Sequence, residues 1–351
     1  MPRRLFLFTG LYALIVVVAF SLWASHGQAK ENRERSTVTV VDQSGRTVAV
    51  PARVERVAAF YHMAGKIVFA LGQQHKLVSQ SLLRNEGEAM ARVDPTFAAK
   101  PLLMGGDTLN LETLMTLRPD VVFVYASLDK TDETEMERIE KTGVKVVAIK
   151  GETFEEGFEA VRLIAKVLNC KDRGEAYIEE CNRLLNLVAK QVLNVRQDKR
   201  PKVLFLGPKG SYDVAGGEMI QTIILRKAGA ENVASGLKGR WPVVSPEQIV
   251  AWNPDVIFVG SGWGGFVAAR LLDNPQLKVV KAVRDRKVFD FPSNIGWWDF
   301  PAPHCVLGIV WVAKTLYPER FKDLSIQAVA DDYYKKYLGY SFTSLGGKLT
   351  P

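Results

Sequence analysis

The segment Leu111-Glu-Thr-Leu-Met-Thr-Leu-Arg-Pro-Asp-Val-Val-Phe-Val124 recurs 135 residues later as Pro246-Glu-Gln-Ile-Val-Ala-Trp-Asn-Pro-Asp-Val-Ile-Phe-Val259. Six of the 14 aligned positions are identical. Each copy predicts a helix, a break at Pro-Asp and a buried strand, because the residue before a proline is pushed out of the helical conformation. The offset is far longer than a solenoid period. The sequence therefore predicts two similar α/β lobes.

Around each copy, short apolar runs alternate with helical stretches, as in residues 121–125, 133–142 and 144–149. Strands separated by helices are typical of a doubly wound parallel sheet. At the other end of the first lobe, residues 37–51 alternate apolar and polar side chains around Asp42-Gln-Ser-Gly45, which predicts a β-hairpin.

A different pattern joins the two repeats. Apolar residues recur every three or four positions from Tyr177 to Val195, which predicts one long amphipathic helix from Asp172 to about Gln197. Its length would be ~39 Å, and Asp172 with Glu175 would form a capping box at its start. We therefore expect an α/β fold of two doubly wound lobes bridged by a single long α-helix. The expected domains are a signal peptide or anchor (1–29), a tether (30–36), an N-terminal lobe (37–157), linking helices (158–198) and a C-terminal lobe (199–351).

The N-terminus has the features of a secretory signal. Arg3 and Arg4 precede an apolar stretch over residues 5–24, and Gly27 and Ala29 fit the small-residue cleavage pattern. The apolar stretch is also long enough to span a bilayer as an uncleaved anchor. Either alternative places the rest of the chain outside the cytoplasm, so we expect a periplasmic protein.

Composition excludes several classes. The 351 residues are 47% hydrophobic and 24% charged, which is ordinary for a globular protein. The net charge of +8 is spread along the chain, whereas a nucleic-acid-binding protein gathers its basic residues on one element. Three cysteines, Cys170, Cys181 and Cys305, are expected to be free thiols, since the first two would lie ~16 Å apart on one helix.

Signals for enzymatic chemistry are weak. Residues 260–265 match G-x-G-x-x-G, but Trp263 inside the loop would crowd a pyrophosphate. The sequence has no nucleophile elbow, no H-E-x-x-H and no P-loop. His62 and His304 fall at predicted strand-to-helix junctions, one in each lobe, where they would line a pocket or ligate a metal directly.

Tryptophan placement points to a ligand pocket. Six tryptophans follow the N-terminal segment, and all lie in the second half of the chain. Two of them, Trp252 and Trp311, fit helix core positions. The other four lie in predicted loops beside glycine and proline, which favours an aromatic wall for a large planar or hydrophobic ligand. These four are Trp241, Trp263, Trp297 and Trp298.

Roughly residues 37–340 resemble the substrate-binding proteins of ABC importers. The resemblance is to the iron–siderophore, haem and vitamin B12 class, in which two lobes are joined by one long helix. It implies capture of an iron–siderophore or similar metal chelate and delivery to a permease and its ATPase, without catalysis or a cofactor. The matching segments are the hairpin 38–51, Asn110-Leu-Glu-x5-Arg-Pro-Asp, the long helix, Ser245-Pro-Glu-Gln-x4-Asn-Pro-Asp and Trp311-x5-Tyr-Pro-x2-Phe321.

The resemblance also implies which residues bind the ligand. Pro303-His-Cys305 departs from the residues that relatives often carry, and some relatives bind molybdate or other metal oxyanions, so the ligand stays open. By position, the candidates are Tyr61, His62, Gly106 and Asp107 in the first lobe and Tyr212, Trp241, Trp263, Trp298 and Asp299 in the second.

Glu112 and Glu247 are the equivalent acids of the two repeats. Acids near a helix N-terminus gain ~0.3–1 kcal/mol from the helix dipole, which accounts for either one alone. In the resembled family, one surface glutamate per lobe docks onto arginines of the permease, and these two positions match. Two alternative functions stay open at this stage: a metalloenzyme or oxidoreductase using the glycine loop and the two histidines, and a membrane-tethered sensor using the same domain.

Overall fold

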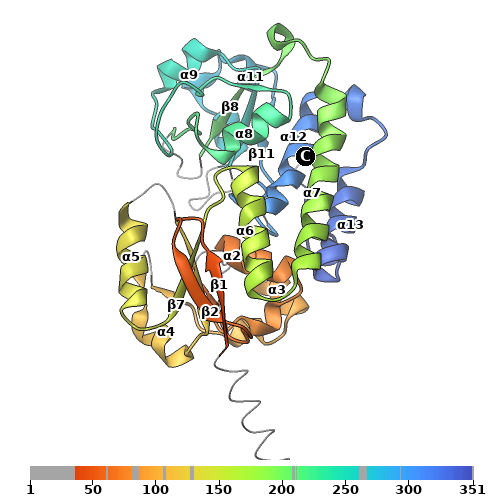
Figure 1. Ribbon diagram of the computed structural model, residues 1–351. Coiled ribbons are helices and arrows are strands. Elements are labelled where there is room, and N and C mark those ends of the chain that lie inside the picture. The colour runs from red at the N-terminus through yellow and green to blue at the C-terminus, as the bar shows by residue number, and fades with distance from the viewer. Residues whose placement is uncertain are drawn as a thin grey trace, which may run out of the picture.

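Residues 36–60, 62–80, 87–105, 108–126, 130–207, 210, 212–260, 267–292 and 294–349 are described by a computed structural model. They form two α/β lobes, one above the other in Figure 1, with helix α7 (Lys171–Val192) along one side of both. This confirms the expected fold class. The predicted signal segment and nearly all of the tether lie outside the described residues. Within the described part of the chain, none of the helices is both long enough and apolar enough to cross a bilayer.

The N-terminal lobe is built on a parallel sheet of order β3-β6-β7. Because side chains alternate along a strand, Val57 and Phe123 face the core shared with α2 and the linking helices, while Ala58 and Val122 face α4 and α5. The elements are β1 (Thr37–Val41), β2 (Thr47–Pro51), β3 (Val57–Ala59), α2 (His62–Ala70), η1 (Gln74–Lys76), α3 (Gly87–Val93), η3 (Phe97–Ala99), β4 (Met104–Gly105), β5 (Thr108–Leu109), α4 (Leu111–Leu117), β6 (Val121–Tyr125), α5 (Lys130–Glu140) and β7 (Lys145–Ile149).

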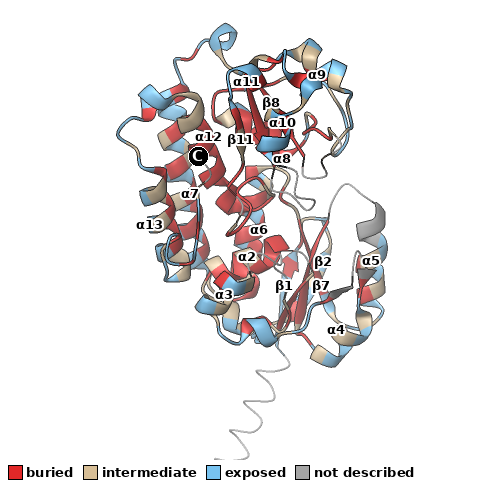
Figure 2. Ribbon diagram, turned by 180° about the vertical axis from the view of Figure 1, so that it is seen from behind, coloured by how far each residue is buried: buried red, intermediate tan, exposed pale blue. Residues whose placement is uncertain are grey.

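The C-terminal lobe carries a parallel sheet of order β11-β10-β8-β9. Phe205 and Phe258 face α8 and α12, whereas Leu204 and Ile257 face α9, α10 and α11, so helices cover both faces. Strands β8 and β10 are buried apart from the first residue of β8, and Figure 2 shows this for β8. The elements are β8 (Lys202–Leu206), α8 (Ile220–Lys227), β9 (Glu231–Asn232), α9 (Pro246–Trp252), β10 (Val256–Val259), α10 (Ala268–Leu272), η5 (Pro275–Leu277), α11 (Lys281–Arg284), β11 (Val288–Asp290), η6 (Pro303–Cys305), α12 (Val306–Leu316), η7 (Pro318–Phe321) and α13 (Ile326–Leu338).

The two lobes are linked by α6 (Phe154–Val167), α7 and the short η4 (Gln197–Lys199). Helix α7 has 22 residues and is therefore ~33 Å long, shorter than expected because it ends at Val192. The predicted capping box is wrong: Cys170 is the N-cap and makes no side-chain cap. The capping box lies instead at the start of α6, between Thr153 and Glu156.

The C-terminal helix α13 does not stay within its own lobe. The hydroxyl of Tyr333 donates to that of Tyr177 on α7 at 2.5 Å, and Lys336 pairs with Glu180 at 3.0 Å. Helix α13 also packs against α2 of the N-terminal lobe. Helix α13 therefore adds a second connection between the lobes beside α7. Although α13 belongs to the C-terminal lobe by sequence, it also supports the N-terminal lobe.

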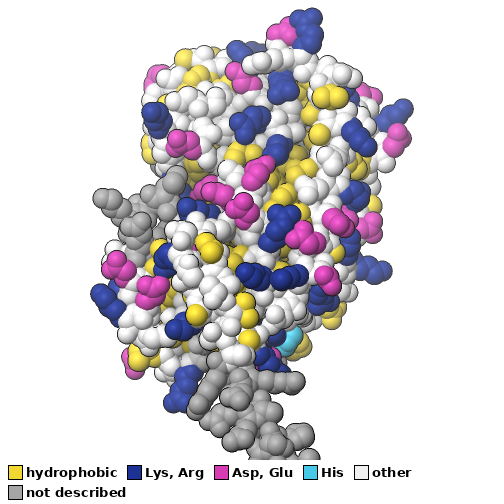
Figure 3. Space-filling model, viewed as in Figure 1, with side chains coloured by type: hydrophobic (Ala, Val, Ile, Leu, Met, Phe, Trp, Pro, Cys, Tyr) yellow, Lys and Arg dark blue, Asp and Glu magenta, His cyan; other side chains and the backbone are white. Residues whose placement is uncertain are grey.

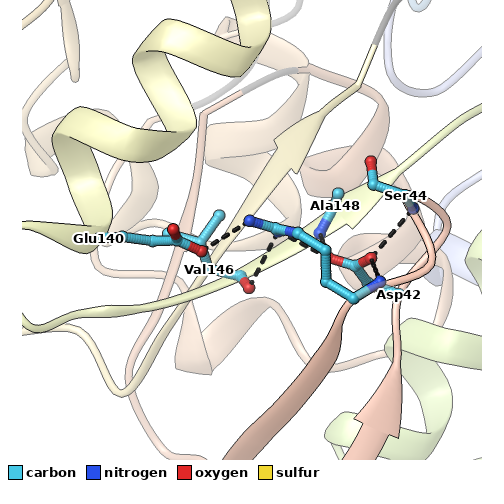
Figure 4. Close-up of polar contacts among 6 residues, drawn as sticks. Asp42, Ser44, Glu140, Val146 and Ala148 are labelled. Carbon is cyan, nitrogen blue, oxygen red and sulfur yellow. Dashed lines mark hydrogen bonds and ion pairs between the residues drawn. The ribbon is translucent and has the colours of Figure 1, made fainter.

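The predicted hairpin is confirmed as the antiparallel pair β1 and β2. Asp42 in its turn is buried and holds the hairpin onto β7 (Figure 4). Its carboxylate accepts hydrogen bonds from the backbone amides of Ser44 and Ala148 and from the guanidinium of Arg46. The Arg46 guanidinium also pairs with Glu140 at 2.6 Å.

All three cysteines are free, as expected. Cys181 and Cys305 are buried, and burial raises the pKa of both thiols, to about 12 for Cys305. Both therefore stay protonated and behave as small apolar side chains. On the face drawn in Figure 3, lysines and arginines are scattered among acids, in line with the spread of charge along the sequence.

Candidate functional site at the junction of the lobes

An ion pair crosses from one lobe to the other. Glu152 follows strand β7 of the N-terminal lobe, and its Oε1 lies 3.7 Å from Nη2 of Arg240 in the C-terminal lobe. The same Oε1 accepts a hydrogen bond from the hydroxyl of Tyr125, at the end of β6, at 2.8 Å. The carboxyl ends of two neighbouring parallel strands thus meet the opposite lobe, which is where open α/β sheets bind ligands. Sequence reasoning missed all three residues, although Glu152 follows a predicted strand and Arg240 adjoins Trp241.

Trp241, a predicted ligand contact, adjoins Arg240. Its ring is half-buried and packs against Phe205 with centroids 6.3 Å apart. Gly207 makes room for it, since a Cβ there would lie 2.6 Å from Trp241 Cε3. The backbone of Trp241 has φ 52°, a left-handed conformation that is costly for a bulky residue. Strain of this kind persists where surrounding structure enforces it, and it is concentrated at functional sites.

Tyr212 shares this strain with φ 56°, but it occupies a different place. Its hydroxyl accepts a hydrogen bond from Asn274 Nδ2 at 2.6 Å, and the ring packs on the core beneath α9 to α11. Tyr212 therefore supports the loop after β8 from the outer side of the sheet.

Trp298 requires a correction. It is 0% exposed, and its Nε1 donates to the hydroxyl of Tyr334 at 3.2 Å, so it belongs to the core and not to a pocket wall. The neighbouring Trp297 faces the N-terminal lobe instead, with its ring 6.4 Å from that of His62. Asp299 is buried beside Gly260, the residue that follows β10. A Cβ added at Gly260 would lie 3.0 Å from Oδ2 of Asp299.

His62 of the N-terminal lobe and His304 of the C-terminal lobe both lie beside Trp297 at the junction. His62 packs edge-on against Phe300 at 4.6 Å, and His304 Nε2 lies 3.0 Å from the carbonyl oxygen of Trp297. Burial lowers the pKa of both rings well below 6.5, and the nearby Lys66 ammonium lowers it further. That ammonium also disfavours a metal cation between the histidines. Among the residues described here, no group of three or more His, Cys, Asp or Glu is placed to hold a metal.

Behind His304 lies a cavity of about 50 Å³. This volume has room for a few water molecules and is too small for a metal chelate. Its walls come from both lobes and from α7 and α13: Lys66, Phe69, Ala70, Met90, Tyr177, Ile295, Gly296, His304, Tyr333, Tyr334, Tyr337 and Leu338.

Four further predicted residues, Tyr61, Gly106, Asp107 and Trp263, lie outside the described residues. The two acids predicted to dock are described, and both are exposed. Their helices α4 and α9 lie on the side of the molecule opposite α7 in Figures 1 and 2. The hydrogen bond with Ser245 lowers the pKa of Glu247, so this acid is ionised at neutral pH.

Exposed apolar side chains accompany both acids, a feature that sequence reasoning missed. Met115, one helical turn after Glu112, is 56% exposed, and Val243, two residues before the N-cap of α9, is 67% exposed. Charged and apolar groups together on an exposed surface are typical of a protein contact.

A two-lobed α/β protein with charged and aromatic side chains converging between its lobes has the architecture of a solute-binding protein. The family model described as periplasmic binding protein matches residues 57–295, and the chain belongs to this family. Its members serve ABC transporters, so the chain is a substrate-binding protein and not an enzyme.

Individual relatives support the same assignment. The molybdate-binding protein MolA of Haemophilus influenzae is 29% identical over 331 residues, covering 86% of this chain and 91% of MolA. A vitamin B12-binding protein of Vibrio vulnificus is 21% identical, covering 75% and 90%. Among solved structures, MolA bound to molybdate has a TM-score of 0.74 at 26% identity, covering 90% of this chain and 100% of that one. CeuE of Helicobacter pylori has a TM-score of 0.75 at 22% identity, covering 89% and 98%.

Proposed function

We propose that this chain captures an anionic metal compound outside the cytoplasm and delivers it to an ABC permease and its ATPase. The observation that carries the proposal is the pairing of Arg240 with Trp241 at the lobe junction. A guanidinium binds carboxylate, catecholate or oxyanion oxygens, and an aromatic face adds apolar contact. An iron–siderophore or similar chelate and a metal oxyanion such as molybdate share this anionic chemistry.

Two of the relatives are named for ligands of this class. MolA is named for molybdate, and a Bacillus subtilis relative, 24% identical over 52% of this chain, is named for ferric citrate. Burial of Trp298 removes one of the aromatic rings that a large planar ligand such as haem would use. Trp297 is buried against His62 and Phe300, so the half-buried ring of Trp241 is the described tryptophan that we assign to the ligand, and a single ring suits a compact ligand.

Titration calorimetry on residues 30–351 tests the proposal. Molybdate, tungstate, ferric citrate, a ferric siderophore, cyanocobalamin and haem are titrated separately, and metal co-purified from the native host is measured by mass spectrometry. Binding of an oxyanion or of an anionic iron chelate supports the proposal, and the probe that binds shows which of these two classes the ligand belongs to. Binding of cyanocobalamin alone, which has no net charge, would contradict the proposal, and binding of haem alone would contradict the preference for a compact ligand. Sequencing the N-terminus of the mature protein tests export, with a new terminus expected near residue 30.

Glu112 and Glu247 are proposed as the contacts with the permease. They occupy equivalent positions on α4 and α9, which matches a partner built with two-fold symmetry. Charges of this kind set orientation and association rate more than affinity.

A further inference from the structure

Arg240 is the cation to which the proposed ligand would bind, and Glu152 is already paired with it. The guanidinium lies in the C-terminal lobe and the carboxylate in the N-terminal lobe, so the pair connects the two. The hydroxyl of Tyr125 donates to the same carboxylate oxygen and fixes its position on the N-terminal side. The carboxylate of Glu152 is thus held in place by the N-terminal lobe and points toward the C-terminal lobe.

The pair is suited to exchange of partners. Its N–O distance of 3.7 Å exceeds the ~2.7–2.9 Å of a charge-assisted hydrogen bond. The side chains are 41% exposed for Arg240 and 21% exposed for Glu152, so solvent screens their attraction. An incoming anion therefore competes with a long, solvent-screened contact for the guanidinium of Arg240, while Glu152 keeps its hydrogen bond to Tyr125.

We propose that Glu152 limits the affinity of this site for its ligand: its carboxylate competes with the ligand for Arg240. This inference rests on the proposed function. A ligand must bring enough negative charge to displace the carboxylate, and a neutral solute gains nothing by doing so. Glu152 therefore lowers the affinity of every anion that uses Arg240 by a similar factor, because breaking the ion pair costs each of them the same free energy. Removing the carboxylate is expected to tighten binding, the reverse of what loss of a ligand contact would do.

A double-mutant cycle with molybdate and ferric citrate as probes tests this. Glu152→Gln keeps the acceptor for Tyr125 and removes the charge. It should tighten binding two- to fivefold, since fivefold equals about 1 kcal/mol, the upper range for an exposed ion pair. Arg240→Gln should weaken binding at least tenfold. Glu155→Gln is the matched control, because it removes an exposed charge three residues away at the start of α6.

Three outcomes separate the possibilities. A gain with Glu152→Gln that exceeds the control and disappears in the Arg240→Gln background supports the inference. A gain equal to that of the control, or one that persists without Arg240, overturns it and leaves the proposed function standing. If the wild-type protein binds neither these two probes nor tungstate nor the ferric siderophore, the proposed function fails, and the inference fails with it because there is no anion to compete with.

Discussion

Acid should destabilise this protein well before its carboxylates titrate. His62 and His304 are buried, and their pKa values are lowered by burial and by Lys66, so the folded protein holds both rings neutral. The unfolded chain protonates them near pH 6.5. As the pH falls below that value, the unfolded state binds protons that the folded state does not, and the free energy of unfolding falls.

The size of the effect follows from linkage. Each neutral buried histidine lowers the free energy of unfolding by at most ~1.4 kcal/mol per pH unit, or ~2.7 kcal/mol for the pair. Carboxylates whose pKa is lowered in the fold, such as Glu180 beside Arg183 and Lys336, add to the loss only below about pH 4.5. The interval from about pH 6.5 to 5 therefore isolates the histidines.

Urea denaturation at half-unit pH steps measures this slope. His304→Gln keeps a nitrogen donor for the carbonyl of Trp297 and should remove about half of the slope, while His75→Gln controls for loss of an exposed histidine. A free energy of unfolding that is flat from about pH 7.5 to 5.5 in the wild type would refute the reasoning, since it requires both rings to bind protons equally in the two states.

Other expectations concern function. The double variant Glu112→Gln, Glu247→Gln should leave folding and ligand affinity nearly unchanged. It should stimulate the reconstituted ATPase less than the wild type does, and that stimulation should depend less on salt. Full stimulation would show that the two acids only stabilise their own helices. Trp241→Ala should weaken ligand binding by ~1–3 kcal/mol and Trp241→Phe by less, measured by calorimetry, whereas equal affinity for all three proteins would remove Trp241 from the site. Scattering curves of free and ligand-bound protein should nearly coincide, and marked compaction on binding would contradict a rigid linkage.

The internal repeat could be predicted from the sequence because its helix, its break at Pro-Asp and its strand depend on residues close together in the chain. Both helices end in a left-handed C-cap, with φ 43° at Arg118 and 45° at Asn253, directly before Pro-Asp. The aspartates explain why that dipeptide recurs. Asp120 accepts hydrogen bonds from the amides of Glu55 and Arg56 beside β3, and Asp255 accepts one from Lys202 at the start of β8. Each aspartate therefore ties its strand to the neighbouring strand.

Features that depend on contacts between residues far apart in the chain could not be predicted from the sequence. The position of α13 against α7 depends on tyrosines about 156 residues apart, and no sequence period connects them. The choice between Trp297 and Trp298 as the ring at the junction depends on the course of a loop, since adjacent residues point in different directions. Arg240 carried no signal of its own, because an arginine in a polar loop is usually solvated.

The bracing of the lobes bears on how a ligand is bound. Helix α7 and helix α13 are joined by the Tyr333–Tyr177 hydrogen bond and the Lys336–Glu180 ion pair, and α13 also rests on α2. A wide hinge motion would have to break these contacts as well as bend α7, because a helix bends sharply only where its hydrogen bonds are interrupted. Exchange of Arg240 from Glu152 to a ligand needs only side-chain rotation. A protein braced in this way would change at the lobe junction on loading while α4 and α9 keep a fixed separation, as the docking on a two-fold permease proposed above would require.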